Sequence, residues 1–233
     1  MDRRHLITGL AGVVLAGCGG KAFNWEAPPQ TERVPSKGTY TVRSGDTLYS
    51  IAFRYGLDHR QLSRWNGLND ATLIYPGQCL RLTQPPAAAN QSRARPPARQ
   101  PVPVSKLDWA WPTAGRVVAR FDLDAQVPRT GILIGGQPGQ PVRAAAPGQV
   151  VYSGSGLKGY GKLVIVQHDP VFLSAYGHNA ALLVAEGERV NAGQRIATMG
   201  ETGAQRPRLH FEVRRNGQPV DPIEPEERRV GKE

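Results

Sequence analysis

The chain has few histidines, and only some of them lie where a metal or acid–base site could form. The five histidines are His5, His59, His168, His178 and His210. His5 lies in the N-terminal leader and His59 in a separate module, and of the remaining three His178 and His210 are the candidates. A catalytic zinc site needs about three protein ligands, usually His or carboxylate, with one position open for water. Two imidazoles do not complete such a set.

The region around these histidines, from about Trp109 to Pro225, resembles the LytM-type (lysostaphin-like) family of peptidoglycan endopeptidases. The matching stretches are residues 131–134, 139–144, 148–150, 160–161, 164–166, 176–178 and 208–213. Enzymes of that family carry His-x-Gly-x-Asp at the first stretch and His-x-His at the last. This chain has Arg129 and Leu133 in place of the first His and the Asp, and Arg208 in place of the first His of the last triplet.

The resemblance therefore implies a peptidase framework whose zinc ligands have been replaced, with Arg129, Leu133, His178, Arg208 and His210 as vestigial positions. An arginine stays protonated and adds positive charge where a dication would bind. We expect no catalytic residues, no cofactor, and hydrogen bonds holding both histidines. The open alternative is a zinc hydrolase with a rearranged site that uses an unforeseen ligand, such as Asp122 or Asp124.

The N-terminus has the layout of an export signal. Arg3 and Arg4 precede a short apolar run, and Leu15-Ala16-Gly17-Cys18 follows it. These last four residues resemble the lipobox of bacterial lipoproteins, so residues 1–17 are predicted to be a signal peptide and Cys18 the lipidated N-terminus. The resemblance implies an anchor on the periplasmic side of the outer membrane, since no Asp follows Cys18.

Two polar segments separate the predicted domains. Residues 18–37 are predicted to be a tether, and residues 84–106 a disordered linker rich in Pro, Ala and Arg that cannot bury a core. The formal net charge is +10, and this linker carries three Arg and one Lys with no acidic residue. A nucleic-acid binder concentrates its charge on one face, so we expect no nucleic-acid partner. The linker charge fits either weak attraction to an anionic surface or solubility alone.

Residues 38–83 are predicted to form a compact β-α-α-β module. Asp46 is placed to cap a first helix whose apolar face recurs at i, i+3, i+4 and i+7 from Leu48, and Gly56 ends it. Asp58 is placed to cap a second helix. Tyr75-Pro76-Gly77-Gln78 suits a type II turn before the closing strand.

This pattern resembles a LysM domain, a family that binds the N-acetylglucosamine-containing glycan of peptidoglycan. Carried over by position, the glycan would lie between two loops. The first loop is Gly45, Asp46, Thr47 and Leu48, and the second is Leu73, Ile74, Tyr75, Pro76 and Gly77. Sugars suit such a groove because their apolar faces pack on side chains while backbone groups bind the N-acetyl amide.

Residues 107–225 are predicted to form a mainly antiparallel β domain, followed by a charged tail over 226–233. Short runs rich in Val, Ile and Leu are separated by Gly and Pro, as expected for such a sheet. The predicted strands are residues 116–121, 149–153, 163–168, 194–199 and 209–214.

The combined layout resembles the NlpD-type lipoproteins, which activate periplasmic N-acetylmuramoyl-L-alanine amidases in septal wall splitting. The resemblance implies a non-catalytic regulator, enriched at the septum, with peptidoglycan, an amidase and the membrane as partners. Arg129, His178, Arg208 and His210 would line its partner-binding groove. The two arginines would either clamp a carboxylate or extend to solvent. A purely structural tether between outer membrane and wall is a further alternative.

Overall fold

The computed structural model describes residues 31–68, 73–85 and 107–223. The predicted signal peptide, lipidated Cys18, most of the linker and the charged tail lie outside the described residues. Within the described residues, no helix is long and apolar enough to cross a membrane.

The N-terminal module has the predicted order of strand, helix, helix and strand. Its elements are β1 (Thr39–Thr41), α1 (Leu48–Tyr55), α2 (His59–Trp65) and β2 (Cys79–Arg81). Strands β1 and β2 pair antiparallel, with Tyr40 opposite Leu80. The predicted apolar face of α1 is buried in the module's own core, packed mainly against Leu62, Leu80 and Leu82.

The cap of α1 differs from the prediction. Thr47, rather than Asp46, is the N-cap: its hydroxyl accepts from the Ser50 N–H at 3.0 Å, and the Ser50 hydroxyl accepts from the Thr47 N–H at 2.9 Å. This reciprocal pair forms a capping box. The Asp46 carboxylate instead accepts from the Arg43 N–H and the Tyr40 hydroxyl. The predictions for Asp58 as the second cap and Gly56 as a left-handed C-cap are confirmed.

The segment preceding β1 is not wholly a free tether. The Glu32 N–H donates to the Arg54 carbonyl at 2.8 Å, and Val34 packs against the module's core. The turn before β2 agrees with the prediction, since Gly77 has a positive φ of 87° and the Gln78 N–H donates to the Tyr75 carbonyl.

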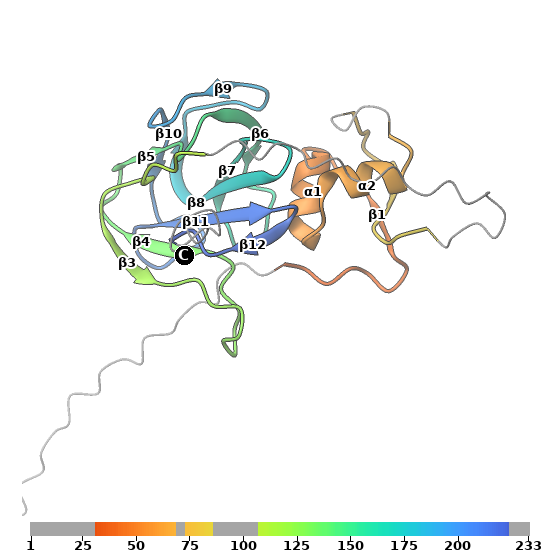
Figure 1. Cartoon of the computed structure of the whole chain (residues 1–233), viewed down its shortest axis with the longest axis horizontal. Coiled ribbons are helices and arrows are strands. Elements are labelled where there is room, and N and C mark those ends of the chain that lie inside the picture. Colours follow the sequence, from red (N-terminus) through yellow and green to blue (C-terminus); the bar gives the residue numbers. More distant parts are fainter. Residues whose placement is uncertain (1–30, 69–72, 86–106, 224–233) are drawn as a thin grey trace, which may run out of the picture.

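The C-terminal domain is an antiparallel β structure (Figure 1). Its main path runs β3-β4-β11-β8-β7-β6-β9; β10 pairs with β5 and β8, and β12 pairs with β11. The bounds are β3 (Arg116–Ala119), β4 (Ile132–Gly135), β5 (Pro141–Arg143), β6 (Gly148–Gly154), β7 (Lys162–Gln167), β8 (Phe172–Leu182), β9 (Arg189–Val190), β10 (Arg195–Met199), β11 (Arg208–Arg215) and β12 (Gln218–Val220). The five predicted strands correspond to β3, β6, β7, β10 and β11.

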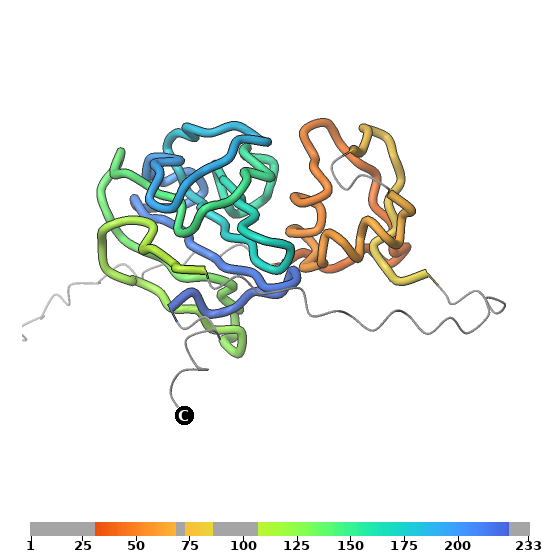
Figure 2. Tube along the Cα trace, turned by 45° about the horizontal axis from the view of Figure 1, so that its top comes forward, coloured from red at the N-terminus to blue at the C-terminus, as the bar shows by residue number. Residues whose placement is uncertain are grey.

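The two domains lie side by side, with α1 against the end of the β domain (Figures 1 and 2). Phe53 of α1 is 2% exposed and packs in a cluster contributed otherwise mainly by β6, β7 and β8. The Tyr49 hydroxyl donates to the Gln167 side chain at 2.9 Å, and the Gln218 amide donates to the Gly56 carbonyl at 2.8 Å. The modules therefore share an apolar cluster and are not merely linked in series.

Candidate functional site

Four of the five vestigial positions, Leu133, His178, Arg208 and His210, lie on the adjacent strands β4, β11 and β8, whereas Arg129 precedes β4. On β11, His210 is opposite Leu133 of β4 on one side and Gly177 of β8 on the other. His178 directly follows Gly177, and its ring centroid lies 6.0 Å from that of His210. The structure therefore brings both histidines and Leu133 together, as the motif resemblance implied.

His178 is held in a fixed pose. It has a positive φ of 65°, uncommon for a residue other than Gly, and its N–H donates to the Tyr160 carbonyl at 2.7 Å. Its ring Nδ1 lies 2.9 Å from the Thr202 carbonyl oxygen, so Nδ1 carries the proton. Burial, with the nearby charges of His210 and Arg208, lowers the pKa of His178 to about 3. This imidazole is neutral at physiological pH.

His210 belongs to a buried polar network around Glu212. The Glu212 carboxylate receives hydrogen bonds from Thr130 and Tyr160 and lies 3.0 Å from the His210 Nε2. Arg214 donates to its other oxygen at 2.6 Å. Burial alone would raise the pKa of Glu212, but Arg214 and His210 outweigh it and lower the pKa to about 2. The Glu212 carboxylate is thus ionised, and both of its oxygens accept hydrogen bonds.

The two arginines do not form the predicted pair. The Arg129 guanidinium binds the Asp122 carboxylate at 2.8 Å and the Arg120 carbonyl at 2.9 Å. Gly131 lies against Glu212, which is four residues along β11 from Arg208. Four strand residues span about 13 Å, so the backbone of Arg129, which lies beyond Gly131, is more than about 13 Å from that of Arg208 along the strand direction. The structure therefore does not bring Arg129 and Arg208 together as a clamp, which was one of the two alternatives, and Arg208 alone adds positive charge beside His178.

The residues present do not fit a catalytic zinc ion. The His210 Nδ1 is buried and has no hydrogen-bond partner within the described structure, so one imidazole nitrogen is available. The position facing His210 across the strands, however, is the hydrocarbon side chain of Leu133. Among residues 31–68, 73–85 and 107–223, no three His, Cys, Asp or Glu side chains gather closely enough to hold a metal. The alternative ligand Asp122 is occupied by Arg129.

The predicted glycan-binding loops differ in exposure. Leu73 and Tyr75 are 54% and 61% exposed, and Pro76 and Gly77 are also exposed. In the other loop Gly45 is exposed and Asp46 and Thr47 are half-buried, whereas Leu48 is fully buried. Leu48, at 0% exposed, presents no surface to a sugar, unlike the other three residues of this loop. Ile74 is half-buried against the module's core.

One sequence pattern indicates the contact between the domains, although that contact was not predicted above. Tyr49 and Phe53 lie four residues apart on α1, outside the apolar face that begins at Leu48. An i, i+4 aromatic pair on a second face indicates a second packing surface. Its counterpart, Arg214, is fully buried and has no comparable signal in the sequence, because a charge within a strand normally faces solvent.

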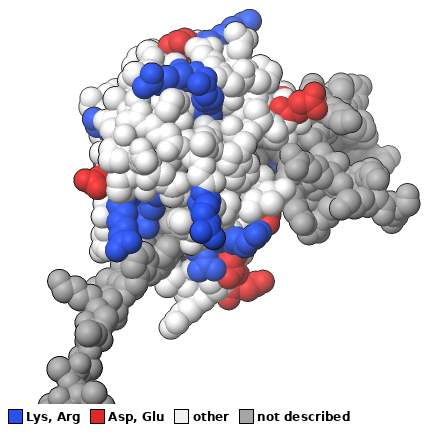
Figure 3. All heavy atoms as spheres, turned by 90° about the vertical axis from the view of Figure 1, so that its left-hand side faces the viewer, with Lys and Arg blue, Asp and Glu red and all other residues white. Residues whose placement is uncertain are grey.

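Basic side chains do not form one continuous surface on the face of the β domain turned away from the N-terminal module. Lys and Arg lie there in several separate groups with uncharged surface between them (Figure 3). This distribution does not resemble the concentrated basic face of a nucleic-acid binder.

Two family models match the chain. The LysM domain model matches residues 40–83, and the Peptidase family M23 model matches residues 127–222.

Relatives match most of its length. A Lipoprotein NlpD/LppB homolog of Pseudomonas aeruginosa is 43% identical, over 86% of this chain and 81% of the relative. The Outer membrane antigenic lipoprotein B of Histophilus somni is 36% identical, over 78% and 65%. The Murein hydrolase activator NlpD of Escherichia coli is 32% identical, over 81% and 67%.

Proposed function

The chain belongs to the NlpD/LppB family of lipoproteins, and on that premise we propose that it is a non-catalytic activator of a periplasmic N-acetylmuramoyl-L-alanine amidase. The family model and a relative named for murein hydrolase activation support this function. The proposal that the chain is non-catalytic rests on the pairing of His210 with Leu133. A hydrocarbon side chain stands there, at the position where the family's enzymes place a carboxylate ligand.

The partner-binding groove is proposed to centre on the half-buried Arg208, with His178 and His210 buried beside it. An activator must bind the active state of its partner more tightly than the inactive state, and reversing a 1:99 ratio requires about 5.5 kcal/mol of preference. Arg208 supplies a cation that suits a carboxylate of the partner. Arg129 is left out because its guanidinium is committed to Asp122.

In this proposal the LysM domain and the lipid anchor bring the chain to its site of action. The LysM domain binds peptidoglycan glycan through residues 45–48 and 73–77, and lipidated Cys18 anchors the chain to the periplasmic face of the outer membrane. Enrichment at the division septum follows if the amidase or its substrate is concentrated there. The names of the relatives support lipidation and envelope localisation.

Reconstitution on isolated sacculi tests the function. The full chain, a candidate amidase and labelled sacculi are combined, and release of wall label is followed with each component omitted in turn. Faster release with both proteins than with amidase alone is expected. Unchanged release across all candidate amidases would refute activation, and normal cell separation after deletion of residues 107–233 would favour a structural tether.

A further inference from the structure

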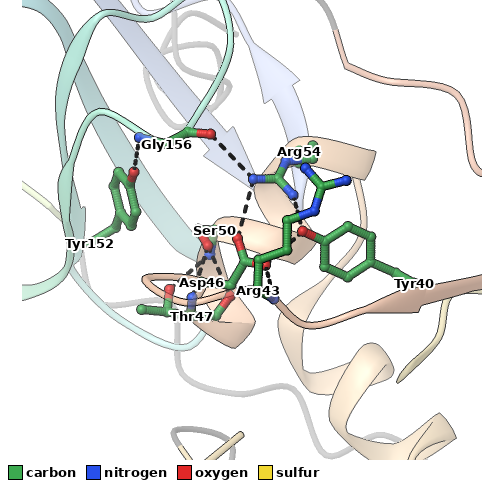
Figure 4. Close-up of polar contacts among 8 residues, drawn as sticks. All are labelled: Tyr40, Arg43, Asp46, Thr47, Ser50, Arg54, Tyr152 and Gly156. Carbon is green, nitrogen blue, oxygen red and sulfur yellow. Dashed lines mark hydrogen bonds and ion pairs between the residues drawn. The ribbon is translucent and has the colours of Figure 1, made fainter. Parts of the chain in front are cut away.

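A pocket of about 570 Å³ lies between the two domains. One wall is the loop between β1 and α1, and the other is the end of β6 with the turn after it and Glu186. Figure 4 shows Tyr152 and Gly156 of the β domain facing Asp46, Thr47 and Arg54 of the LysM domain. The first wall is also the first predicted glycan-binding loop, so a sugar held there would lie at the rim of this pocket.

Internal polar contacts fix the loop against the β domain. The Asp46 carboxylate accepts from the Tyr40 hydroxyl at 2.6 Å and from the Arg54 guanidinium at 3.3 Å. Arg54 also donates to the Gly156 carbonyl across the interface at 3.4 Å, and the Thr47 hydroxyl donates to the Val151 carbonyl at 3.4 Å. Asp46 and Arg54 neutralise each other, and the pocket is preformed.

Two further charges on the lining are open to a ligand. Arg43 is exposed, and its guanidinium lies 5.7 Å from the centroid of the Tyr40 ring. Glu186 is exposed on the opposite wall and accepts from the Ser153 N–H at 3.3 Å. The pocket thus presents one cation and one anion from different domains, with Ser44 and Ser155 as neutral polar groups.

This lining suits a charged peptide better than another sugar ring. Sugar rings pack on exposed apolar or aromatic faces, and such faces occur on the other loop, at Leu73 and Tyr75. Within the pocket the sole aromatic side chain is Tyr152, which is 3% exposed. Serines, glycines and opposite charges instead match a ligand with carboxylates, amides and an amine.

We propose that the interdomain pocket binds the peptide stem of a peptidoglycan strand whose glycan is held by the LysM loops. Arg43 binds a carboxylate of the stem, and Glu186 binds an amine. This inference rests on the proposed peptidoglycan binding and adds that the β domain takes part in it. The chain would then prefer wall from which peptides have not yet been removed, which is the substrate of an amidase.

Calorimetric titration of the full chain in detergent micelles tests the pocket with three probes: chitotetraose, a peptidoglycan tetrasaccharide carrying its stem peptides, and the same tetrasaccharide after enzymatic removal of the peptides. The peptide-bearing probe is expected to bind about tenfold more tightly than its peptide-free form. Arg43→Ala should abolish this difference, and Glu186→Gln should reduce it, with chitotetraose affinity unchanged in both. Arg64→Ala, an exposed arginine on α2 away from the pocket, is the matched control and should behave as wild type.

The outcomes separate the two proposals. Equal binding of peptide-bearing and peptide-free glycan would overturn the pocket inference and leave LysM glycan binding intact. Absence of binding to all three probes would overturn both. If Arg43→Ala weakened chitotetraose equally, Arg43 would belong to the glycan groove itself, and the pocket inference would also fail.

Discussion

The guanidinium carbon of Arg214 lies 3.5 Å from the centroid of the Phe53 ring, and its Nη1 donates to the Phe53 carbonyl at 2.6 Å. These residues come from different domains. Arg214 at the same time donates to Glu212, which contacts His210 of the vestigial site. A single buried side chain therefore connects the LysM helix to the strand that carries the proposed partner-binding groove.

Phe53→Ala should uncouple the domains. Truncating a buried Phe removes about 3–5 kcal/mol, and here most of that packing is between domains. Differential scanning calorimetry should show one unfolding transition for the wild-type chain and two for the variant. Val118→Ala, at a position 59% exposed, is the control and should leave one transition at an unchanged temperature. A single unshifted transition in Phe53→Ala would contradict the shared cluster.

Glu212→Gln should destabilise the β domain strongly. The substitution leaves the fully buried Arg214 cation without its carboxylate, and breaking one side of a buried ion pair costs about 3–5 kcal/mol. Urea unfolding at pH 7 measures the change. Exposed Glu201→Gln serves as the reference and should shift the midpoint little. Equal midpoints for the two variants would show that the buried pair contributes nothing.

Stability should fall on mild acidification, partly through His178. Its pKa is about 3 in the folded chain and near 6.5 when unfolded, so the unfolded state binds more protons between these values. Stability therefore decreases as pH falls below about 6.5, by about 2 kcal/mol at pH 5 from this residue. His178→Asn, which tolerates a positive φ, should lose correspondingly less stability between pH 7 and pH 5. Parallel pH dependence of the two proteins would contradict this assignment.

Arg208→Ala should weaken amidase activation without weakening sacculus binding. Arg208 belongs to the proposed groove, whereas wall binding is assigned to the LysM domain. Activation by the variant is expected to drop about tenfold or more, as for loss of one charge-assisted contact. Arg195→Ala, exposed on β10, should activate normally. Parallel losses in activation and sacculus pelleting would indicate misfolding instead of a lost partner contact.

Local patterns predicted the elements that depend on local chemistry. The apolar face of α1, the Asp58 cap and the left-handed Gly56 all follow from neighbouring residues. The strand β8 did not, although it is the longest, because residues 174–180 read Ser-Ala-Tyr-Gly-His-Asn-Ala and lack the β-branched side chains that mark strands. Burial between β7 and β11 fixes that strand through tertiary contacts.

The sequence predicted which residues lie at the candidate site but not the contacts that they make. Motif positions located His178, His210 and Leu133 correctly beside one another. The commitment of Arg129 to Asp122 depends on an isolated bridge between two loop segments, which sequence spacing does not reveal. The role of Arg214 likewise depends on a partner more than 150 positions away in the chain.

The most direct test of the central claim is the chemical nature of wall fragments released from isolated sacculi in the presence of zinc. The full chain alone is predicted to release none, and the chain with its amidase should accelerate release of free peptides cut from the glycan. Fragments cut within the peptide cross-links by the chain alone would show a working endopeptidase and contradict the account.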